Sequence, residues 1–439
     1  MRNAGELDAF WLPFTPNRHF KLAPRLIKRA EGMYFYDEQD RALLDTCSGL
    51  WCVNAGHGRT KIVEAIRRAA GELDFAPAFQ FAHRRAFELA REIVLLAPAG
   101  LDRVFFVNSG SEAVDTALKI ARAYFAKGGQ GSRYRLIGRE KAYHGVNFGG
   151  ISVGGIANNR KSFGPLVPGT DDHLPLPYDR ASMGFTRGEP ATGLEYADAL
   201  ETIVSLHGAE TIAAVIVEPF SGSAGVYASP KGYLKRLRSI CDRHGILLIF
   251  DEVITGFGRL GAAFAAERYG VVPDLITFAK GITNGSVPMG GVLVHDDIYR
   301  AFEDGPDHAI ELFHGHTYSA HPLAAAAGLA TLSLYKEEDL FARAKTLEET
   351  LASALHSLKG ERGVADIRNV GVAAGIDIEP DPAAPGRRGY EALRRAFAEE
   401  DMVLRIGGDT IALAPALIAT ESEVERMIDG VRNVLKNLD

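Results

Sequence analysis

The stretch ILLIFDEVITGFGRLGAAFAAERYGVVPDLITFAK, residues 246–280, contains two short apolar segments that each end in a charged side chain. Residues 246–251 close with Asp251, and residues 274–280 close with Lys280. Both segments are almost wholly apolar, which predicts strands buried on both faces of a parallel sheet. One short helix between them would make the strands parallel neighbours. Because open α/β sheets bind ligands beyond the carboxyl ends of their strands, we expect both side chains at one sheet edge.

Two more strands and their covering helices are predicted outside this stretch. Residues 103–107 and 212–218 are apolar runs of the same kind, and residues 111–125 and 231–244 have helical patterns. Gly245 stands directly after the second helical pattern, where a glycine commonly ends a helix. Strands that alternate with helices predict a parallel sheet covered by helices, so we expect an α/β fold.

The two ends of the chain differ from its middle. A proline-rich arm precedes a predicted hairpin at residues 34–44, and residues 149–190 predict a long irregular excursion because Gly, Pro, Asn and Asp are frequent there. Long helices are predicted at residues 321–335 and 340–358, followed by short strands and helices of a smaller α+β unit. We therefore expect three regions: residues 1–60, an N-terminal arm and small-domain segment; residues 61–325, a large domain; and residues 326–439, a C-terminal small domain.

Composition and charge exclude several classes of protein. At 439 residues the chain is long enough for about two to four structural units. A net charge of −7 without a basic stripe argues against nucleic acid as a partner. No apolar run approaches the roughly 18 residues of a membrane helix, and the first residues do not resemble a signal peptide, so we expect a cytoplasmic protein with no membrane partner. The three cysteines, Cys47, Cys52 and Cys241, are interpreted as free thiols.

Several short motifs suggest other chemistries but lack the context that these need. GFGRLG at residues 256–261 matches a dinucleotide-binding pattern, yet it neither follows a strand directly nor opens a long helix. GISVG at residues 150–154 matches a serine-hydrolase pattern without a strand before it. The dipeptide Gly-Lys is absent, so no P-loop lysine is predicted. His314, His316 and His321 lack Glu or Cys partners at ligand spacing, and no metal is expected.

The segment VNSGSEAVDTALKIA, residues 107–121, predicts an anion site. A buried strand leads through a Ser-Gly-Ser turn into a helix, so the N–H groups of Gly110 and Ser111 would point out of the helix start. The hydroxyls of Ser109 and Ser111 would add donors for a phosphate. The alternative is an ordinary serine N-cap with Glu112 in the first turn.

The carboxylate of Asp251 and the amine of Lys280 admit two interpretations. A lysine at the end of a buried strand is costly when charged, so it either pairs with an acid or loses its charge in a covalent bond to an aldehyde. A plain ion pair with Asp251 is one interpretation. Together with a phosphate site, the pair also fits pyridoxal 5′-phosphate (PLP), with the acid at the pyridinium nitrogen and the amine at the aldehyde.

Beyond these deductions, the sequence resembles the class III (omega) aminotransferases of PLP fold type I, and within them the omega-amino acid:pyruvate group that includes beta-alanine:pyruvate enzymes. The resemblance covers nearly the whole chain and rests on WLPFTPNR, GLWCVNAGHG, NSGSEAVDTALK, YHG, VEPFSGSAGV, LLIFDEVITGFGR, FAKGITNG and HTYSAHPL. It implies a large domain with a mostly parallel seven-stranded sheet and a smaller α+β domain built from the N-terminal arm and the C-terminal region. The implied reaction moves the terminal amine of beta-alanine, or of a similar omega-amino acid or amine, to pyruvate.

The resemblance also implies roles for individual residues. Lys280 matches the catalytic lysine that forms the Schiff base, Asp251 the partner of the pyridinium nitrogen, and Tyr143 the catalytic aromatic residue that stacks on the cofactor ring. Val253 would pack on the opposite face of the ring. Further cofactor contacts are implied for Ser109, Gly110, Ser111, His144, Glu218 and Thr317. Glu218 has an alternative reading as a solvent-facing strand end. Thr317 would reach the phosphate of a neighbouring subunit, which implies a homodimer with shared active sites or a homotetramer.

Arg405, after a predicted strand at residues 402–404, is the implied substrate-binding residue. An arginine binds a carboxylate with two hydrogen bonds, which suits pyruvate or an omega-amino acid, although a surface salt bridge is the alternative. Relatives that act on GABA or ornithine carry a glutamate where this chain has Ser223. This departure argues against those two substrates.

Three aromatic residues would complete the substrate pocket. Trp51, Tyr143 and Phe14 would form an apolar wall able to accept uncharged amines, with plain core packing as the alternative. Taurine or aromatic and aliphatic amines are therefore rival donors. A decarboxylase or aminomutase of the same fold, and a cofactor-free binding protein that has kept it, are the other competing functions.

Overall fold

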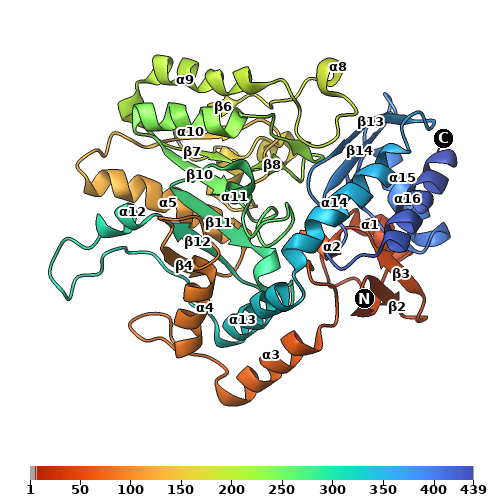
Figure 1. The fold of residues 1–439 in the computed structure, drawn as a ribbon, viewed down its shortest axis with the longest axis horizontal. Helices are drawn as coiled ribbons and strands as arrows, with labels where there is room; N and C mark the ends of the chain where they lie inside the picture. The colour runs from red at the N-terminus through yellow and green to blue at the C-terminus, as the bar shows by residue number, and fades with distance from the viewer. Residues whose placement is uncertain (1–4, 6, 439) are drawn as a thin grey trace.

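The computed structural model describes residue 5 and residues 7–438, and its centre is a seven-stranded sheet (Figure 1). In spatial order its strands are β4 Arg103–Val107, β12 Gly290–Val294, β11 Leu275–Ala279, β10 Leu247–Asp251, β7 Ile212–Val217, β5 Arg135–Arg139 and β6 His173–Leu174. The neighbours from β11 to β6 pair in parallel, whereas β12 runs antiparallel to β11 and β4. The expected α/β fold with a mostly parallel seven-stranded sheet is confirmed.

The two strands predicted from residues 246–280 lie at the centre of this sheet. β10 and β11 are parallel neighbours in which Phe250 pairs with Ile276 and Asp251 with Thr277. Every residue of both strands is buried, because both faces of the sheet are covered. Their connection contains the short helix α11 Ala265–Tyr269, as expected. Both strands therefore end at the same edge of the sheet.

Helices cover the two faces of the sheet. α5 Gly110–Lys127 packs in one apolar cluster with Ile249, whereas α10 Tyr233–His244 packs in another with Phe250. These consecutive residues point to opposite faces because side chains alternate along a strand. Gly245 ends α10 in the left-handed conformation with φ 62°, as predicted.

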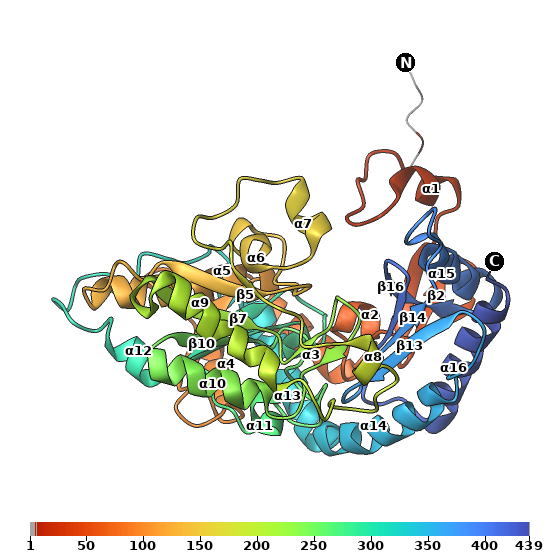
Figure 2. The same ribbon diagram turned by 90° about the horizontal axis from the view of Figure 1, so that it is seen from above.

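A smaller unit is built from both ends of the chain and lies beside the sheet (Figure 2). One of its sheets contains β1 Ile27–Glu31, β2 Tyr34–Asp37, β3 Ala42–Asp45 and β15 Met402–Val403, and the other contains β13 Val364–Asn369, β14 Ala374–Ile378, β17 Thr410–Leu413 and β16 Arg405–Gly407. β15 runs parallel to β3, so the N-terminal and C-terminal parts share one sheet. The predicted small α+β domain is confirmed, and its exact boundaries near residues 60 and 325 remain predictions.

The other elements connect or cover these sheets. They are α1 Asn17–Leu22, α2 Ser48–Trp51, α3 Thr60–Glu72, α4 Arg84–Val94, α6 Phe148–Val153, α7 Ala157–Lys161, α8 Arg180–Met183, α9 Ala199–His207, α12 Asp296–Arg300, α13 Pro322–Glu337, α14 Leu340–His356, α15 Arg387–Glu399, α16 Glu421–Lys436 and the ribbon β8 Phe220–Ser221 with β9 Tyr227–Ala228. Both long helices predicted after residue 320 are present as α13 and α14. Within the described part of the chain, no helix combines the length and apolar character that crossing a bilayer requires.

Two local predictions differ from the structure. Residues 149–190 hold most of α6, all of α7 and α8, and the sheet-edge strand β6, which are too short to show a period in the sequence. The single strand predicted at residues 402–404 is split, because β15 pairs with β3 whereas the next strand, β16, pairs with β17. Arg405 is therefore the first residue of β16 rather than a residue that follows a strand.

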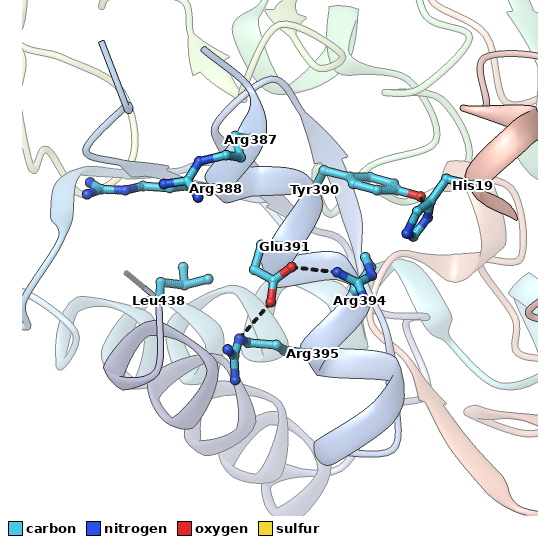
Figure 3. Close-up of a pocket in the computed structure, with 8 residues that line it drawn as sticks. All are labelled: His19, Arg387, Arg388, Tyr390, Glu391, Arg394, Arg395 and Leu438. Atoms are coloured by element: carbon cyan, nitrogen blue, oxygen red, sulfur yellow. Dashed lines mark hydrogen bonds and ion pairs between the residues drawn. The ribbon is translucent and has the colours of Figure 1, made fainter. Parts of the chain in front are cut away.

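The N-terminal arm contacts the smaller unit through α1. His19 Nδ1 lies 2.9 Å from the Tyr390 hydroxyl on α15, and a hollow of about 440 Å³ opens beside this contact (Figure 3). Glu391 pairs there with both Arg394 and Arg395. None of the side chains that line the hollow is a predicted site residue. The candidate site lies at the carboxyl ends of β10 and β11 instead.

Candidate active site

Asp251 is held by three hydrogen bonds at the end of β10. Its Oδ2 lies 2.7 Å from His144 Nδ1, and its Oδ1 accepts from the backbone N–H of Val253 and from the Thr277 hydroxyl, both at 3.1 Å. Asp251 is 5% exposed and His144 is 1% exposed. Three donors around one buried carboxylate fix its orientation and satisfy its charge.

Lys280 begins the 3-10 helix η3 Lys280–Thr283 directly after β11, with a left-handed φ of 52°. Burial lowers the pKa of its amine, while the nearby carboxylates of Asp251 and Glu218 act in the opposite direction. No ion pair within 4.0 Å joins Lys280 to Asp251, both of which belong to the described residues. The structure therefore does not contain the plain ion pair, and the amine lies near two acids without being fixed to either.

The Ser-Gly-Ser turn forms the start of α5. Ser109 is the N-cap, and its hydroxyl accepts from the N–H of Glu112 at 3.2 Å, so the ordinary capping role is present. The first N–H groups of a helix have no partner within it and remain suited to an anion. Ser111 Oγ accepts from the Val146 N–H at 3.1 Å. A Cβ on Gly110 would lie 2.9 Å from Val253, so only glycine allows this close approach of helix and loop.

Tyr143, His144 and Glu218 form a compact group beside Asp251. The Glu218 carboxylate accepts from the backbone N–H of Tyr143 and of Gly222, both at 3.1 Å. Glu218 is 5% exposed, so its interpretation as a solvent-facing strand end is wrong. Burial raises the pKa of Glu218, partly against the influence of His144. Burial also raises the pKa of Tyr143, which lies within electrostatic reach of Asp251 and Arg405.

Arg405 stands at the start of β16 in the smaller unit. It pairs with Ala412 of β17. A Cβ on Gly407, two residues later, would lie 3.4 Å from the Ser223 carbonyl, which places the Ser223 segment beside the same strand. Burial raises the pKa of the Cys47 thiol to about 12 although Arg405 and Lys280 both act to lower it. The Cys47 segment therefore lies within reach of both cations.

Trp51 is buried in an apolar cluster rather than exposed to an open cavity. It is 4% exposed, and its ring centroid lies 6.5 Å from that of Phe220. The cluster also contains Cys47, Ile254 and Ala412. This surrounding agrees with core packing and leaves a substrate-facing role of Trp51 as a prediction.

Two predicted residues lie away from the group within one chain. Phe14 is 73% exposed and belongs to the arm that precedes α1. Thr317 is exposed in the segment before α13. Their predicted roles therefore remain predictions that require a second copy of the chain or a movement of the arm.

Sequence reasoning missed Thr277 and Glu252. Thr277 is a single polar residue within the apolar strand β11, and this isolation is the signal from which its bond with Asp251 could have been predicted. Glu252 is fully buried and caps α11: its carboxylate accepts from the N–H groups of Ala265 and Ala266 at 2.5 and 3.0 Å. It also accepts from the Thr255 hydroxyl at 2.9 Å. Glu252 thus fixes the loop that follows Asp251.

Substitution Glu252→Gln is expected to destabilise the fold by about 1–3 kcal/mol, because an amide cannot accept all three bonds and leaves a buried donor unpaired. Burial raises the pKa of Glu252 from 4.5 to about 7. The folded state therefore holds the proton more tightly than the unfolded state, and this group's contribution to stability falls as pH rises between those values. The parent's free energy of unfolding measured in urea should therefore exceed that of the variant by more at pH 5 than at pH 8. An advantage that grows with pH would contradict this assignment.

The histidines after residue 310 have structural partners. His314 stacks on Phe105 at 5.5 Å, and burial lowers its pKa to about 4. His321 is the N-cap of α13 and accepts from the N–H of Leu323. Among the described residues, no three His, Cys, Asp or Glu side chains gather as a possible metal site.

The residues at the ends of β10 and β11 suit PLP. A buried carboxylate, an amine with a lowered pKa and a helix start lie on neighbouring elements, and they match the ring nitrogen, the aldehyde and the phosphate of the cofactor. The glycine at position 110 lets the helix start and the Val253 side chain approach each other closely. His144 directs Nδ1 at Asp251, and its Nε2 is buried with no hydrogen-bond partner among the described residues. The residues present therefore fit this cofactor.

Comparison with known proteins agrees with this site. The family model described as Aminotransferase class-III matches residues 15–435. An omega-aminotransferase of Caulobacter vibrioides is 57% identical over 436 residues, which cover 99% of each chain. A beta-alanine–pyruvate aminotransferase of Pseudomonas aeruginosa is 48% identical and covers 98% of this chain and 96% of its own. A PLP-bound amine transaminase structure from an uncultivated Pseudomonas species is 35% identical, with a TM-score of 0.87 over 98% of this chain and 99% of that one. The chain belongs to the PLP-dependent class III aminotransferase family.

Proposed function

We propose that this omega-aminotransferase moves the terminal amine of beta-alanine, or of a similar omega-amino acid or amine, to pyruvate. The products are L-alanine and the corresponding semialdehyde, aldehyde or ketone. The observation that carries the proposal is the position of Arg405. Arg405 lies within electrostatic reach of Tyr143, and its strand lies beside a segment that holds Ser223 rather than an acidic residue. The names of the two relatives, an omega-aminotransferase and a beta-alanine–pyruvate aminotransferase, support it.

The residues that would hold the cofactor come from four segments. Lys280 would hold the aldehyde end, Asp251 would face the ring nitrogen, and residues 109–111 would bind the phosphate at the start of α5. Tyr143 and Val253 would contact the two ring faces. When bound, PLP supplies an aldehyde that takes up the amine of the donor and a ring that accepts electrons after the loss of a proton.

Lys280 is the proton carrier in this proposal. Its lowered pKa enlarges the neutral fraction of the amine near pH 7, and a neutral amine can accept a proton. Nζ would take the proton from the amine-bearing carbon of the donor and pass a proton to the aldehyde carbon of the cofactor, and in the second half-reaction it would move a proton the opposite way, onto the acceptor carbon. Because donor and acceptor use the same site in turn, we expect ping-pong kinetics.

Arg405 would bind the carboxylate of pyruvate and of an omega-amino acid donor. A guanidinium forms two charge-assisted hydrogen bonds with a carboxylate. Ser223 has no negative charge with which to neutralise this arginine, so Arg405 stays available for an acidic substrate. An amine without a carboxylate would require the side chain of Arg405 to move aside.

Arg405→Leu is expected to raise the KM for pyruvate about a hundredfold, because two charge-assisted hydrogen bonds are worth roughly 3 kcal/mol. The first half-reaction with an uncharged aryl amine should change much less. Single-turnover measurements with each substrate separate the two effects. Arg362→Leu, at an exposed position of the same unit, is the matched control. An equal loss for aryl amine and pyruvate would contradict the role of Arg405.

A donor panel with pyruvate tests the proposed function. Alanine formation is measured with beta-alanine, longer omega-amino acids, taurine, and aliphatic and aryl amines. Highest kcat/KM with beta-alanine or another omega-amino acid supports the proposal. A preference for taurine or aryl amines would replace the donor, and release of carbon dioxide without alanine would indicate a decarboxylase.

We also propose a homodimer in which Thr317 reaches the phosphate site of the other subunit, since it is exposed within its own chain. Mixed dimers of a Lys280→Ala chain and a Thr317→Ala chain test this directly. If Thr317 is shared, the site that keeps Lys280 also receives an intact threonine, and activity should exceed that of both parental variants. Activity no higher than that of the Thr317→Ala sites alone would show that each site uses its own threonine.

A further inference from the structure

The loop after β3, residues 47–51, holds only the short and kinked turn α2 and has a strained backbone. Ser48, Gly49 and Trp51 have φ values of 46°, 65° and 65°, in the left-handed region that residues with a side chain rarely adopt. Ser48 and Trp51 carry a Cβ, so the steric cost of this backbone conformation, which glycine avoids, remains at both positions. Such backbone persists only where the surrounding structure holds it in place, and it is frequent at ligand sites.

The Asp45 carboxylate holds the first half of this loop. It is the last residue of β3 and is 2% exposed. Its Oδ1 accepts from the Cys47 N–H at 3.0 Å, and its Oδ2 accepts from the Gly49 N–H at 2.5 Å and lies 2.8 Å from His57 Nε2. The two backbone N–H groups flank Ser48, so one side chain fixes the turn on both sides of the first strained residue.

A second contact ties the loop to the end of β17. The Ser48 hydroxyl donates to the Ala414 carbonyl at 2.6 Å and accepts from the fully buried Arg259 at 3.2 Å. Ala414 directly follows the strand that pairs with Arg405 through Ala412. The loop is thereby held in a fixed place relative to the strand that carries the proposed substrate arginine.

The loop ends at Trp51, which packs in an apolar cluster with residues of both units of the chain. The indole packs against Phe220 of the segment that follows Glu218, and Cys47 lies within electrostatic reach of both Lys280 and Arg405. A shift of the backbone at residues 47–51 would therefore move an indole that lies between the two units of the chain. Nothing in the chemistry of the reaction itself requires Asp45, which contacts neither Lys280 nor Asp251 through any hydrogen bond among the described residues.

We propose that Asp45 is a positioning residue for donor binding: its carboxylate keeps Ser48, Gly49 and Trp51 in their left-handed conformation and so fixes Trp51 beside the donor site. The link from Trp51 to donor binding rests on the proposed function. The link from Asp45 to Trp51 rests on the hydrogen bonds alone. The two links can be tested separately.

The fluorescence of Trp51 in the holoenzyme tests the first link. The chain has two tryptophans, and Trp11 is 86% exposed in the arm, so Trp11→Phe leaves Trp51 as the single reporter. In that background, the amide side chain introduced by Asp45→Asn has only one acceptor oxygen, and its N–H₂ group faces donors that the carboxylate bound in the parent. We expect acrylamide quenching of Trp51 to increase about twofold or more, with emission shifted to longer wavelength, as the loop opens locally.

Two further variants separate this effect from general destabilisation. Asp37→Asn is the matched control, because Asp37 is also buried at 5% exposure and accepts from two backbone N–H groups, Gln39 and Arg41, both at 3.0 Å. It stands at the end of the neighbouring strand β2 and does not lead to Trp51. Gly49→Ala keeps Asp45 but strains the same loop, because alanine rarely adopts the φ of 65° found there. The added Cβ would meet only Cys52 and Val53 at an ordinary 3.6 Å, so it introduces no clash. It should reproduce the quenching of Asp45→Asn, whereas Asp37→Asn should not.

Steady-state kinetics of the same variants test the second link. Asp45→Asn and Gly49→Ala should raise the KM for the donor about tenfold while kcat changes by less than about threefold. Unchanged Trp51 quenching in both variants, or equal quenching in Asp37→Asn, would overturn the role of Asp45. Increased quenching with an unchanged donor KM would overturn its connection to donor binding. Absence of turnover in the Trp11→Phe parent with every donor would count against the proposed function and leave the quenching result decisive for Asp45.

Discussion

Lys280→Ala is expected to lower kcat/KM at least about a thousandfold for every donor, because it removes both the covalent anchor and the proton carrier. The lowered pKa of the amine and its position directly after β11 are the observations behind this expectation. The parent holoprotein should show a visible absorbance that borohydride abolishes while fixing the cofactor covalently to the chain, and the denatured variant should carry no cofactor after the same treatment. Alanine formation from donor and pyruvate gives the rate.

A matched lysine and a chemical rescue make this result specific. Lys235→Ala, at an exposed position on α10, should keep both the absorbance and the rate. A small primary amine added to the Lys280→Ala protein should restore part of the activity, since it can carry the proton that Nζ carries in the parent. Cofactor that stays covalently attached to the denatured Lys280→Ala chain after borohydride reduction would instead place the covalent bond on another residue.

Much of this arrangement was predictable because buried parallel strands leave a clear trace in a sequence. The apolar runs that end in Asp251 and Lys280 cannot be solvent-exposed, and a short connection between them admits few topologies. The structure confirms that β10 and β11 are parallel neighbours that end together. The start of α5 was predictable for the same local reason, since Ser109 precedes a long helix.

Contacts between distant segments were not predictable from local pattern. His144 comes shortly after β5, a strand that is not among those predicted from the sequence, and its bond to Asp251 depends on how β5 and β10 are ordered in the sheet. Arg405 stands where the chain changes from one sheet to another, a point that an apolar run of three residues does not reveal. The strained loop at residues 47–51 is equally hidden, because backbone conformation there is set by Asp45 rather than by its own residues.

The same comparison explains why the donor is harder to predict than the reaction. Asp251 and Lys280 lie at the ends of the buried central strands, whereas Trp51 and Ser223 lie in loop segments and Arg405 lies on a short strand of the smaller unit. Loops position substrates with fewer sequence constraints than core strands. The chemistry could therefore be predicted from the residues at the strand ends, whereas the donor specificity has to be measured by kinetics.

Asp251→Asn is expected to reduce kcat about a hundred- to a thousandfold while cofactor binding persists, because the amide cannot stabilise positive charge on the ring nitrogen. The substitution keeps the size of the side chain and one oxygen that can accept from Val253 and Thr277. Fold and cofactor content should therefore remain near the parent values. The rate loss should persist with added primary amine, which distinguishes this variant from Lys280→Ala.

A graded pair of changes shows whether the charge or the hydrogen bonds of Asp251 matter. Thr277→Val removes one of its three donors and leaves the carboxylate in place, so kcat should fall by about tenfold or less. If the hydrogen-bonded orientation alone were important, Thr277→Val and Asp251→Asn would give similar losses. If negative charge at the ring nitrogen is required, the loss for Asp251→Asn must be much the larger, because this variant removes the charge whereas Thr277→Val keeps it.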